Sequence, residues 1–316
     1  MNILVTGAAG FIGSHLGEKL LKEGYKVIGV DNFDSFYARE IKEKNLEGLR
    51  KSPDYTFYQL DLKQKNGFDQ IKEQIDAVIH LAAKAGVLPS IKDPQGYLAT
   101  NVGGTQNLLE FMQQRKINKF LFASSSSVYG NNRKVPFSET DLVDNPISPY
   151  AFSKKACELL NYTYHYLYKI DVLNLRFFTV YGPRQRPDLA IHKFFNLIKS
   201  DTPIPIYGDG STARDYTFVK DTVQGIMNAL HYLESHSNVY ETLNLGNSKP
   251  VKLLDLVSAI YTVLNKEPNL IFKPMQPGDV DITFADISKA KKLIGYEPQV
   301  TLEEGLRKFN EWLETN

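Results

Sequence analysis

Cysteine is nearly absent from this chain, and no long apolar run is found in it. Cys157 is the only cysteine among 316 residues, which excludes an internal disulfide and is typical of the reducing cytoplasm. No apolar stretch approaches the roughly 18 residues that a membrane-spanning helix needs. The segment that follows Met1 has no basic start of the kind found in signal peptides. We therefore expect a soluble, cytoplasmic protein that does not enter a membrane.

An excess of charge of either sign is also missing. Lys and Arg number 37 against 36 Asp and Glu, so no field is expected that would attract nucleic acid. The chain has no internal repeat and no low-complexity segment, and we expect no metal site. Any anionic ligand must then be held by a few individually placed residues.

Strand-like apolar runs alternate with helical patterns through the first half of the chain. The runs are Ile3–Val5, Lys26–Val30, Tyr55–Tyr58, Ala77–His80, Phe120–Ala123 and Val172–Arg176. Helical patterns lie between or after them at His15–Glu23, Gln106–Gln114 and Ala151–Tyr168. Nearly continuous apolar strands are typical of a parallel sheet covered on both faces. The alternation therefore predicts an α/β protein with a doubly wound parallel (Rossmann) sheet.

The composition changes after about residue 180, where Pro and Gly become denser. We expect a smaller, mixed α/β C-terminal lobe to begin there. Thr242–Leu245 looks like one more strand, returning to the main sheet. The predicted division is a dinucleotide-binding domain over 1–178, with a contribution from about 215–246, and a substrate lobe formed by 179–214 and 247–316.

A glycine-rich turn follows the first predicted strand. Gly7, Gly10 and Gly13 are spaced as GxxGxxG, a departure from the commoner GxGxxG. Glycine lets the backbone approach a pyrophosphate, and the start of the next helix supplies N–H donors. Asp31 closes the second predicted strand, 18 residues after Gly13, near the spacing at which an acid binds the adenosine ribose. Its charge would repel a 2′-phosphate, which favours NAD over NADP.

Two further segments are candidates for contact with the cofactor. Asp61 and Leu62 follow the third predicted strand and could meet the adenine, although an Asp there could equally cap a helix. Leu81, Ala82 and Ala83 follow the fourth. Their small side chains would let a cofactor lie against the backbone, or they could serve tight helix–sheet packing.

A second motif points to acid–base chemistry on a hydroxyl group. Lys154 comes four residues after Tyr150, on the same face of a predicted helix. A tyrosine with a pKa near 10 is a poor base at neutral pH, and an ammonium about 4 Å away could stabilise its phenolate. Ser124–Ser127 follows the fifth predicted strand, where a doubly wound sheet presents its ligand crevice. Of the four serines we favour Ser125 as the one that passes the substrate proton towards Tyr150.

These motifs, in this order, resemble those of the extended short-chain dehydrogenase/reductases, in the group of NAD-dependent nucleotide-sugar epimerases and dehydratases. The similar segments are Val5–His15, Ser124–Gly130, Tyr150–Lys154, Arg176–Pro183, and Gly208–Gly210 with Arg214–Tyr216. The resemblance runs from Met1 to about Leu306. Within the group, Arg176–Asp188 (RFFTVYGPRQRPD) looks most like the UDP-glucuronate 4-epimerases.

The resemblance implies a tightly bound NAD that is regenerated in each turnover. The residues that it places around this cofactor are Gly7, Gly10, Phe11, Ile12, Gly13, Asp31, Asn32, Asp61, Leu62, Leu81, Ala82, Ala83, Lys84, Asn101, Ser124, Tyr150, Lys154, Phe177 and Val180. It also implies a homodimer that pairs helices around Thr100–Gln114 and Ala151–Tyr168.

The reaction implied by the resemblance is a 4-epimerisation. Related dehydratases and decarboxylases carry an acidic residue before the Val-Tyr-Gly, and this chain has Ser127 there. Without that carboxylate, elimination chemistry lacks its proton shuttle. We expect UDP-glucuronate to be converted to UDP-galacturonate through a transient 4-keto sugar. A UDP-glucose or UDP-N-acetylglucosamine 4-epimerase is the alternative. A catalytically silent NAD-binding scaffold is the alternative of another class, and the intact Ser125, Tyr150 and Lys154 disfavour it.

The implied UDP-sugar site rests on more scattered residues. They are Val87, Ser125, Ser126, Ser127, Tyr150, Thr179, Arg186, Ile191, His192, Lys193, Ile206, Tyr207, Arg214 and Asp279. Thr179 and Arg186 are the candidates for contact with a sugar carboxylate, through a bidentate fork in the case of Arg186; diphosphate binding or a surface salt bridge is the alternative for Arg186. Apolar packing is the alternative for Ile206 and Tyr207. One departure concerns Leu88, where the UDP-glucuronate 4-epimerases usually carry an arginine.

Overall fold

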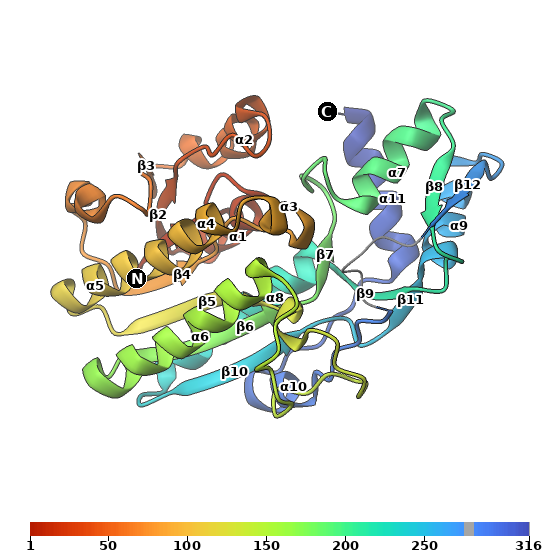
Figure 1. The fold of residues 1–316 in the computed structure, drawn as a ribbon. Coiled ribbons are helices and arrows are strands. Elements are labelled where there is room, and N and C mark those ends of the chain that lie inside the picture. Colours follow the sequence, from red (N-terminus) through yellow and green to blue (C-terminus); the bar gives the residue numbers. More distant parts are fainter. Residues whose placement is uncertain (275–280, 316) are drawn as a thin grey trace.

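A seven-stranded parallel sheet forms the centre of the molecule (Figure 1). The computed structural model describes residues 1–274 and 281–315. In this sheet the strands lie in the order β3-β2-β1-β4-β5-β6-β10. Their bounds are Asn2–Thr6 (β1), Lys26–Asp31 (β2), Tyr55–Gln59 (β3), Ala77–His80 (β4), Lys119–Ser125 (β5), Asp171–Phe177 (β6) and Tyr240–Leu245 (β10). The order reverses direction beside β1, so the predicted doubly wound sheet is confirmed.

Helices cover both faces of the sheet because its strands are apolar on both sides. On β1, Ile3 and Val5 belong to the same buried cluster as Leu16 of α1 (Phe11–Lys22) and Ile226 of α8 (Val219–Ser235). Leu4 points to the opposite face. There it shares a cluster with Leu108 and Met112 of α5 (Gly104–Arg115) and Cys157 of α6 (Pro149–Tyr168).

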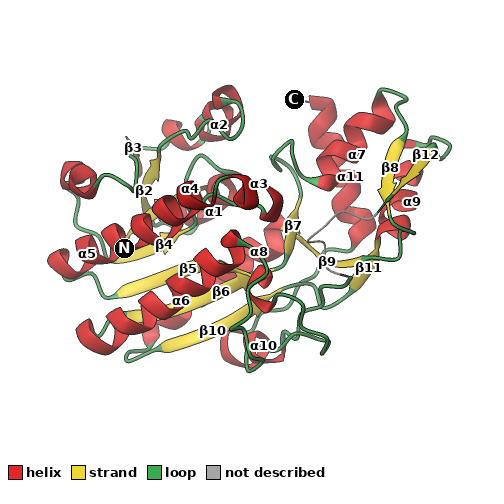
Figure 2. Cartoon of the chain, in the orientation of Figure 1, coloured by secondary structure: helices red, strands yellow, loops and turns green. Residues whose placement is uncertain are grey.

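The second lobe is built from short strands and three packed helices (Figure 2). A three-stranded sheet joins β7 (Thr179–Tyr181), β9 (Ala213–Phe218) and β11 (Pro250–Lys252). A two-stranded sheet joins β8 (Ile204–Tyr207) and β12 (Leu270–Lys273). The helices are α7 (Ala190–Lys199), α9 (Leu253–Leu264) and α11 (Leu302–Thr315). Phe195 of α7 and Phe309 of α11 pack edge to face at 5.0 Å between ring centroids.

Four further short α-helices lie around the main sheet. They are α2 (Arg39–Leu46), α3 (Val87–Lys92), α4 (Pro94–Tyr97) and α10 (Ser288–Ile294). A π-helical turn, Leu98–Gly103, joins α4 to α5. No helix in the described part of the chain is both long and apolar enough to span a membrane.

The strand predicted at Thr242–Leu245 is present as part of β10, which pairs in parallel with β6. The chain thus leaves the main sheet after β6, builds β7, α7, β8 and β9, and returns through α8 to complete the sheet edge. Whether the two lobes divide at 178, 214 and 246 stays a prediction.

Candidate active site

A cavity of about 390 Å³ opens at the carboxyl ends of the parallel strands. It is bordered by the ends of β1, β2, β4, β5 and β6 and by the start of the second lobe at β7. All but one of the predicted NAD contacts line it: Gly7, Gly10, Phe11, Ile12, Gly13, Asp31, Asn32, Asp61, Leu62, Leu81, Ala82, Ala83, Lys84, Ser124, Tyr150, Lys154, Phe177 and Val180. The structure therefore brings together residues from the carboxyl ends of most strands of the main sheet.

The glycine turn forms a cradle that side chains would fill. Gly7 has a φ of +73°, which favours glycine. A Cβ placed on Gly13 would lie 2.1 Å from the Gly7 carbonyl oxygen, and one on Gly7 would lie 2.8 Å from the Ala82 nitrogen. Helix α1 begins directly after this turn, and its cap residue Gly10 offers no side-chain oxygen to the first N–H groups. Bare backbone at a helix start suits a diphosphate, so these residues fit a dinucleotide.

Asp31 lies at the end of β2, and its carboxylate points towards the glycine turn. It accepts hydrogen bonds from the backbone N–H groups of Ala9, at 3.2 Å, and Phe33, at 2.8 Å. Burial raises the pKa of Asp31, while those two donors and the nearby Lys42 ammonium oppose the rise. Each oxygen retains a lone pair that a ribose diol could use.

The one predicted NAD contact that does not line the cavity is Asn101, which lies behind it. Its amide accepts from the Lys84 N–H at 2.8 Å and donates to the Lys84 carbonyl at 3.0 Å. It also donates to the Ser153 hydroxyl at 2.9 Å. Asn101 therefore fastens the Lys84 backbone, which does line the cavity, to helix α6. A direct contact between the Asn101 side chain and the cofactor stays a prediction.

Tyr150 and Lys154 lie in the first turns of α6, as predicted. Ser148 caps this helix by accepting from the Ala151 N–H at 3.1 Å, and Pro149 occupies its first turn. The Ser125 hydroxyl is close enough to Tyr150 to lower the pKa of the phenol. The Ser125 hydroxyl in turn donates to the Ser127 hydroxyl at 3.1 Å. A chain of hydroxyl groups therefore runs from the phenol into the serine loop.

The ammonium of Lys154 contacts the backbone instead of the phenol. It donates to the Ala123 carbonyl at 2.7 Å and lies 4.9 Å from the Phe122 ring centroid. Burial lowers the pKa of Lys154 to about 8, against the opposing influence of Cys157 and Glu158. Burial raises the pKa of Tyr150, opposed by the Ser125 hydrogen bond and the charge of Arg186. A direct contact between ammonium and phenol is thus not what the structure shows, because a buried ammonium needs acceptors and the end of β5 provides one.

Only some of the predicted substrate residues lie at the cavity. Ser125, Tyr150, Thr179 and Arg186 line it. The residues that do not line it are Val87, Ser126, Ser127, Ile191, His192, Lys193, Ile206, Tyr207 and Arg214. Asp279 lies outside the described residues. The binding roles of all these predicted substrate residues stay predictions.

Three of these residues are part of the packing of the second lobe. Ile191 and Ile206 are buried in the main hydrophobic cluster. His192 is 8% exposed; its Nδ1 lies 2.7 Å from the Gln185 carbonyl, and its ring packs edge-on against Phe309. The apolar-packing interpretation accounts for Ile206 without a ligand.

Arg186 reaches the cavity with its guanidinium already paired. Its Nε and one terminal nitrogen donate to the two carboxylate oxygens of Asp188, at 2.9 and 2.8 Å. The guanidinium carbon also lies 4.8 Å from the centroid of the Phe36 ring. A substrate carboxylate would therefore meet the other edge of the guanidinium, which the two terminal nitrogens form, or displace Asp188.

The sequence reasoning missed part of the cavity wall. Asp34, Phe36, Tyr37 and Lys42 all line it, and all follow the acid of β2. The Lys42 ammonium donates to the Asp34 carbonyl at 2.6 Å and lies 4.6 Å from the Tyr37 ring centroid. The two aromatic residues that follow Asp31 closely in the sequence, Phe36 and Tyr37, could have indicated this part of the wall.

The sequence profile of the GDP-mannose 4,6 dehydratase family matches residues 4–309. MJ1055, an uncharacterised protein of Methanocaldococcus jannaschii, is 47% identical over 100% of this chain and 97% of its own. The UDP-glucuronate 4-epimerase of Thermodesulfobacterium geofontis is 44% identical over 99% of this chain and 96% of its own. The crystal structure of a Bacillus cereus UDP-glucuronic acid 4-epimerase in complex with UDP-glucuronic acid and NAD is similar, with a TM-score of 0.92 and 38% identity, over 100% of this chain and 99% of that one. This chain therefore belongs to the GDP-mannose 4,6 dehydratase family of nucleotide-sugar short-chain dehydrogenase/reductases.

Proposed function

We propose that this protein is an NAD-dependent 4-epimerase that converts UDP-glucuronate to UDP-galacturonate. The observation that carries the proposal is the convergence of Ser125, Tyr150 and Lys154 with the glycine turn on one cavity. The similar proteins of Thermodesulfobacterium geofontis and Bacillus cereus are UDP-glucuronate 4-epimerases. NAD would be held by the Gly7–Gly13 cradle and Asp31, and when bound it supplies the hydride acceptor and donor.

The protein's own groups handle the proton. Tyr150 removes the proton of the C4 hydroxyl as the sugar passes to its 4-keto form, and it returns that proton after the sugar has turned over. Ser125 holds the C4 hydroxyl of the substrate close to the phenol of Tyr150. Lys154 keeps a positive charge close to Tyr150, which stabilises the phenolate through space. The wall of Phe177, Phe178 and Leu189 helps to exclude water from the reacting carbon.

Arg186 and Thr179 support an acidic sugar. Both line the cavity, and the guanidinium supplies the planar fork that suits a carboxylate. The 4-keto form of a glucuronate is a β-keto acid, which loses CO₂ readily. Holding the carboxylate in place would suppress this side reaction.

A neutral UDP-hexose is the second candidate substrate. It is favoured by the Arg186–Asp188 pair, because Asp188 takes the Nε edge of the guanidinium and offsets its charge. Leu88, in the place of an arginine, is 47% exposed and does not line the cavity. It therefore bears on the substrate less directly than Arg186 does.

Product analysis by NMR tests the proposal. The protein is incubated separately with UDP-glucuronate, UDP-glucose and UDP-N-acetylglucosamine. UDP-galacturonate formed without release of CO₂, with little turnover of the other two, supports it. Turnover of neutral sugars alone would assign the second candidate, and no turnover of any of them would support the silent scaffold.

We also propose a homodimer in the cytoplasm. Large apolar side chains are exposed along α6 and the turn beside it: Leu98 is 37% exposed, Phe152 49%, Leu159 59% and Tyr166 65%. Three of them recur every seven residues on one helix, which makes a continuous face that a second copy could cover. The single, buried Cys157 fits a reducing compartment. Light scattering of the wild type and of Leu159→Glu tests the dimer, which the variant should convert to a monomer.

A further inference from the structure

Three side chains on one face of α6 contact the end of β5. Tyr150, Lys154 and Glu158 are four residues apart and therefore share a face of the helix. The first two meet β5 as described above. Glu158 does so through Ser124, whose hydroxyl donates to its Oε1 at 2.6 Å. Glu158 is the member of this row that the proposed reaction does not use.

The carboxylate of Glu158 is buried and ion-paired. Arg176 of β6 donates to its two oxygens, from Nε at 2.9 Å and from a terminal nitrogen at 2.8 Å. Both side chains are 3% exposed. Although burial opposes its charge, the Glu158 carboxylate raises the pKa of Arg176. Each charge of the pair compensates the other, which matters here because a lone buried charge is strongly unfavourable.

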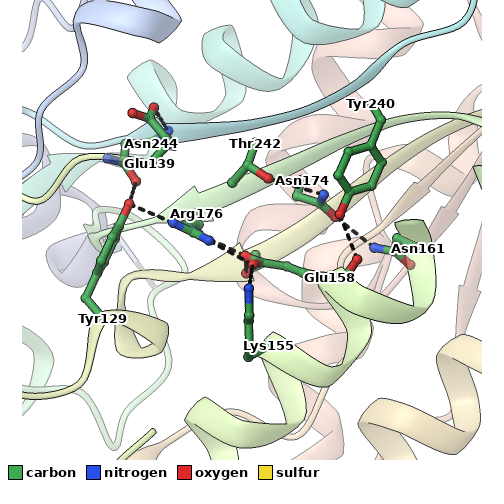
Figure 3. A network of polar contacts seen from close by, with 11 residues as sticks. Tyr129, Glu139, Lys155, Glu158, Asn161, Asn174, Arg176, Tyr240, Thr242 and Asn244 are labelled. Carbon is green, nitrogen blue, oxygen red and sulfur yellow. Dashed lines mark hydrogen bonds and ion pairs between the residues drawn. The ribbon is translucent and has the colours of Figure 1, made fainter. Parts of the chain in front are cut away.

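The pair belongs to a polar network that extends away from the cavity (Figure 3). The third nitrogen of Arg176 donates to the Tyr129 hydroxyl at 3.0 Å. That hydroxyl donates to the Asn244 side chain of β10 at 2.7 Å. The Lys155 ammonium lies 3.8 Å from Oε2 of Glu158. These contacts hold Glu158 in one position relative to β5 and β6.

Ser124 is left with only acceptor capacity towards the cavity. A serine hydroxyl has one hydrogen, and here that hydrogen goes to Glu158. Ser124 also lines the cavity. Its lone pairs are thus what a bound molecule meets, and its neighbour Ser125 is fixed by the same strand end.

Glu158 also lies one turn from Lys154. Its negative charge is among the influences that favour the protonated ammonium. The other titratable group that acts on Lys154 from its own helix is the Cys157 thiol. On β4, His80 faces it; burial lowers the pKa of that imidazole to about 3, so it is neutral. The positive charge of Arg176 is committed to Glu158 itself.

We propose that Glu158 is a positioning residue for the reaction, which fixes Ser124 as a hydrogen-bond acceptor and supplies the counter-charge of Lys154. This inference rests on the proposed function. Glu158 does not line the cavity, and it acts through those two residues.

The test replaces both members of the ion pair, as Glu158→Leu/Arg176→Met. Replacing both charges by apolar groups of similar size leaves neither unpaired, and such changes are often neutral for stability. We expect a melting temperature and bound-NAD content near those of the wild type. We expect kcat to fall by about 100-fold with KM nearly unchanged, and the alkaline limb of the activity profile to move to lower pH.

Tyr129→Phe is the matched control, since it cuts the network beyond Arg176 and leaves the contact between Glu158 and Ser124 intact. It should keep wild-type kcat. A double variant with wild-type melting temperature, kcat and pH profile would overturn the inference. The wild-type turnover on each UDP-sugar is measured first, so that failure of the proposed function is seen separately.

Should the double variant fail to fold, a double-mutant cycle of Glu158→Gln and Ser124→Ala replaces it. If Glu158 acts through Ser124, the loss of kcat caused by Glu158→Gln shrinks in the Ser124→Ala background. Additive losses would contradict the inference.

Discussion

The Lys154 ammonium donates to the Ala123 carbonyl, 2.7 Å away, and not to the phenol of Tyr150 one turn earlier on the same helix. The contact ties the first half of α6 to the end of β5. The Lys154 charge is therefore held at a fixed point by the backbone and not by a hydrogen bond to the phenol. A lysine held in this way retains two further N–H groups for a bound ligand.

Replacing Tyr150 by Phe should abolish turnover, since Phe keeps the ring and loses the proton-carrying oxygen. We expect a fall in kcat of about 100- to 10,000-fold, measured by NMR on the preferred UDP-sugar. Bound NAD, released by denaturation and assayed, should remain at the wild-type level. Substantial residual activity would remove Tyr150 from the role of base.

Activity should fall as the pH rises through about 8, the value to which burial lowers the pKa of Lys154. Deprotonation there removes the charge that supports the phenolate. The fall should not reflect unfolding. Between about pH 8 and 10.5 the unfolded chain binds more protons at this lysine than the folded chain does, so its contribution to the free energy of unfolding rises with pH.

A pH series of kcat alongside melting temperature checks this second prediction. A loss of activity that follows the melting temperature would contradict it. Lys154→Met should have low activity at every pH and lack this alkaline limb.

Arg186→Leu should lose activity selectively on UDP-glucuronate, by about 10- to 100-fold in kcat/KM, as expected for a charged hydrogen-bonding partner worth 1.5–3 kcal/mol. Neutral UDP-sugars should be affected much less. Arg184→Leu is the control, because Arg184 pairs with Glu18 at the surface and does not line the cavity. Equal losses on acidic and neutral sugars would refute the carboxylate role.

Asp188→Asn addresses the same guanidinium from the other side. It frees part of the fork that Asp188 occupies. We expect a lower KM for UDP-glucuronate and little change for UDP-glucose. A rise in KM for both sugars would show that Asp188 is needed to hold Arg186 in place.

Gly13→Ala should prevent retention of NAD. The new Cβ would lie 2.1 Å from the Gly7 carbonyl oxygen, so the cradle must open. Gly48→Ala is the control: Gly48 has a φ of −67°, and the nearest atom to its new Cβ is the Glu18 Oε1 at 3.9 Å. Bound NAD per chain, measured after purification, should be near zero for the first variant and unchanged for the second.

The main sheet could be predicted from the sequence because its strands are apolar on both faces. Each of the runs from Ile3–Val5 to Val172–Arg176 lies within an observed strand. The short strands β7, β8, β9, β11 and β12 were not predicted. Proline and glycine residues interrupt this part of the sequence. The pairing of these strands also depends on contacts between distant segments.

The site was predictable where one motif supplies its own geometry, as in the Gly7–Gly13 turn and the first turns of α6. Arg186 shows the limit: its residue type predicts a fork, but only the fold shows that Asp188 occupies one edge of it. Ile191 and Ile206 show another, since an apolar side chain suits a uridine pocket and a core equally. Asn101 is a third case, because its position behind the cavity depends on the π-helical turn.

The late return of the chain as β10 has a consequence for synthesis and truncation. Until residues 240–245 have emerged, β6 is the edge of the sheet. Its backbone N–H and C=O groups on that side are then unpaired, on a strand that is buried along its whole length in the finished protein. An apolar open edge of this kind recruits strands from other chains. A fragment that stops at residue 178 would therefore tend to aggregate, because it lacks the strand that covers this edge.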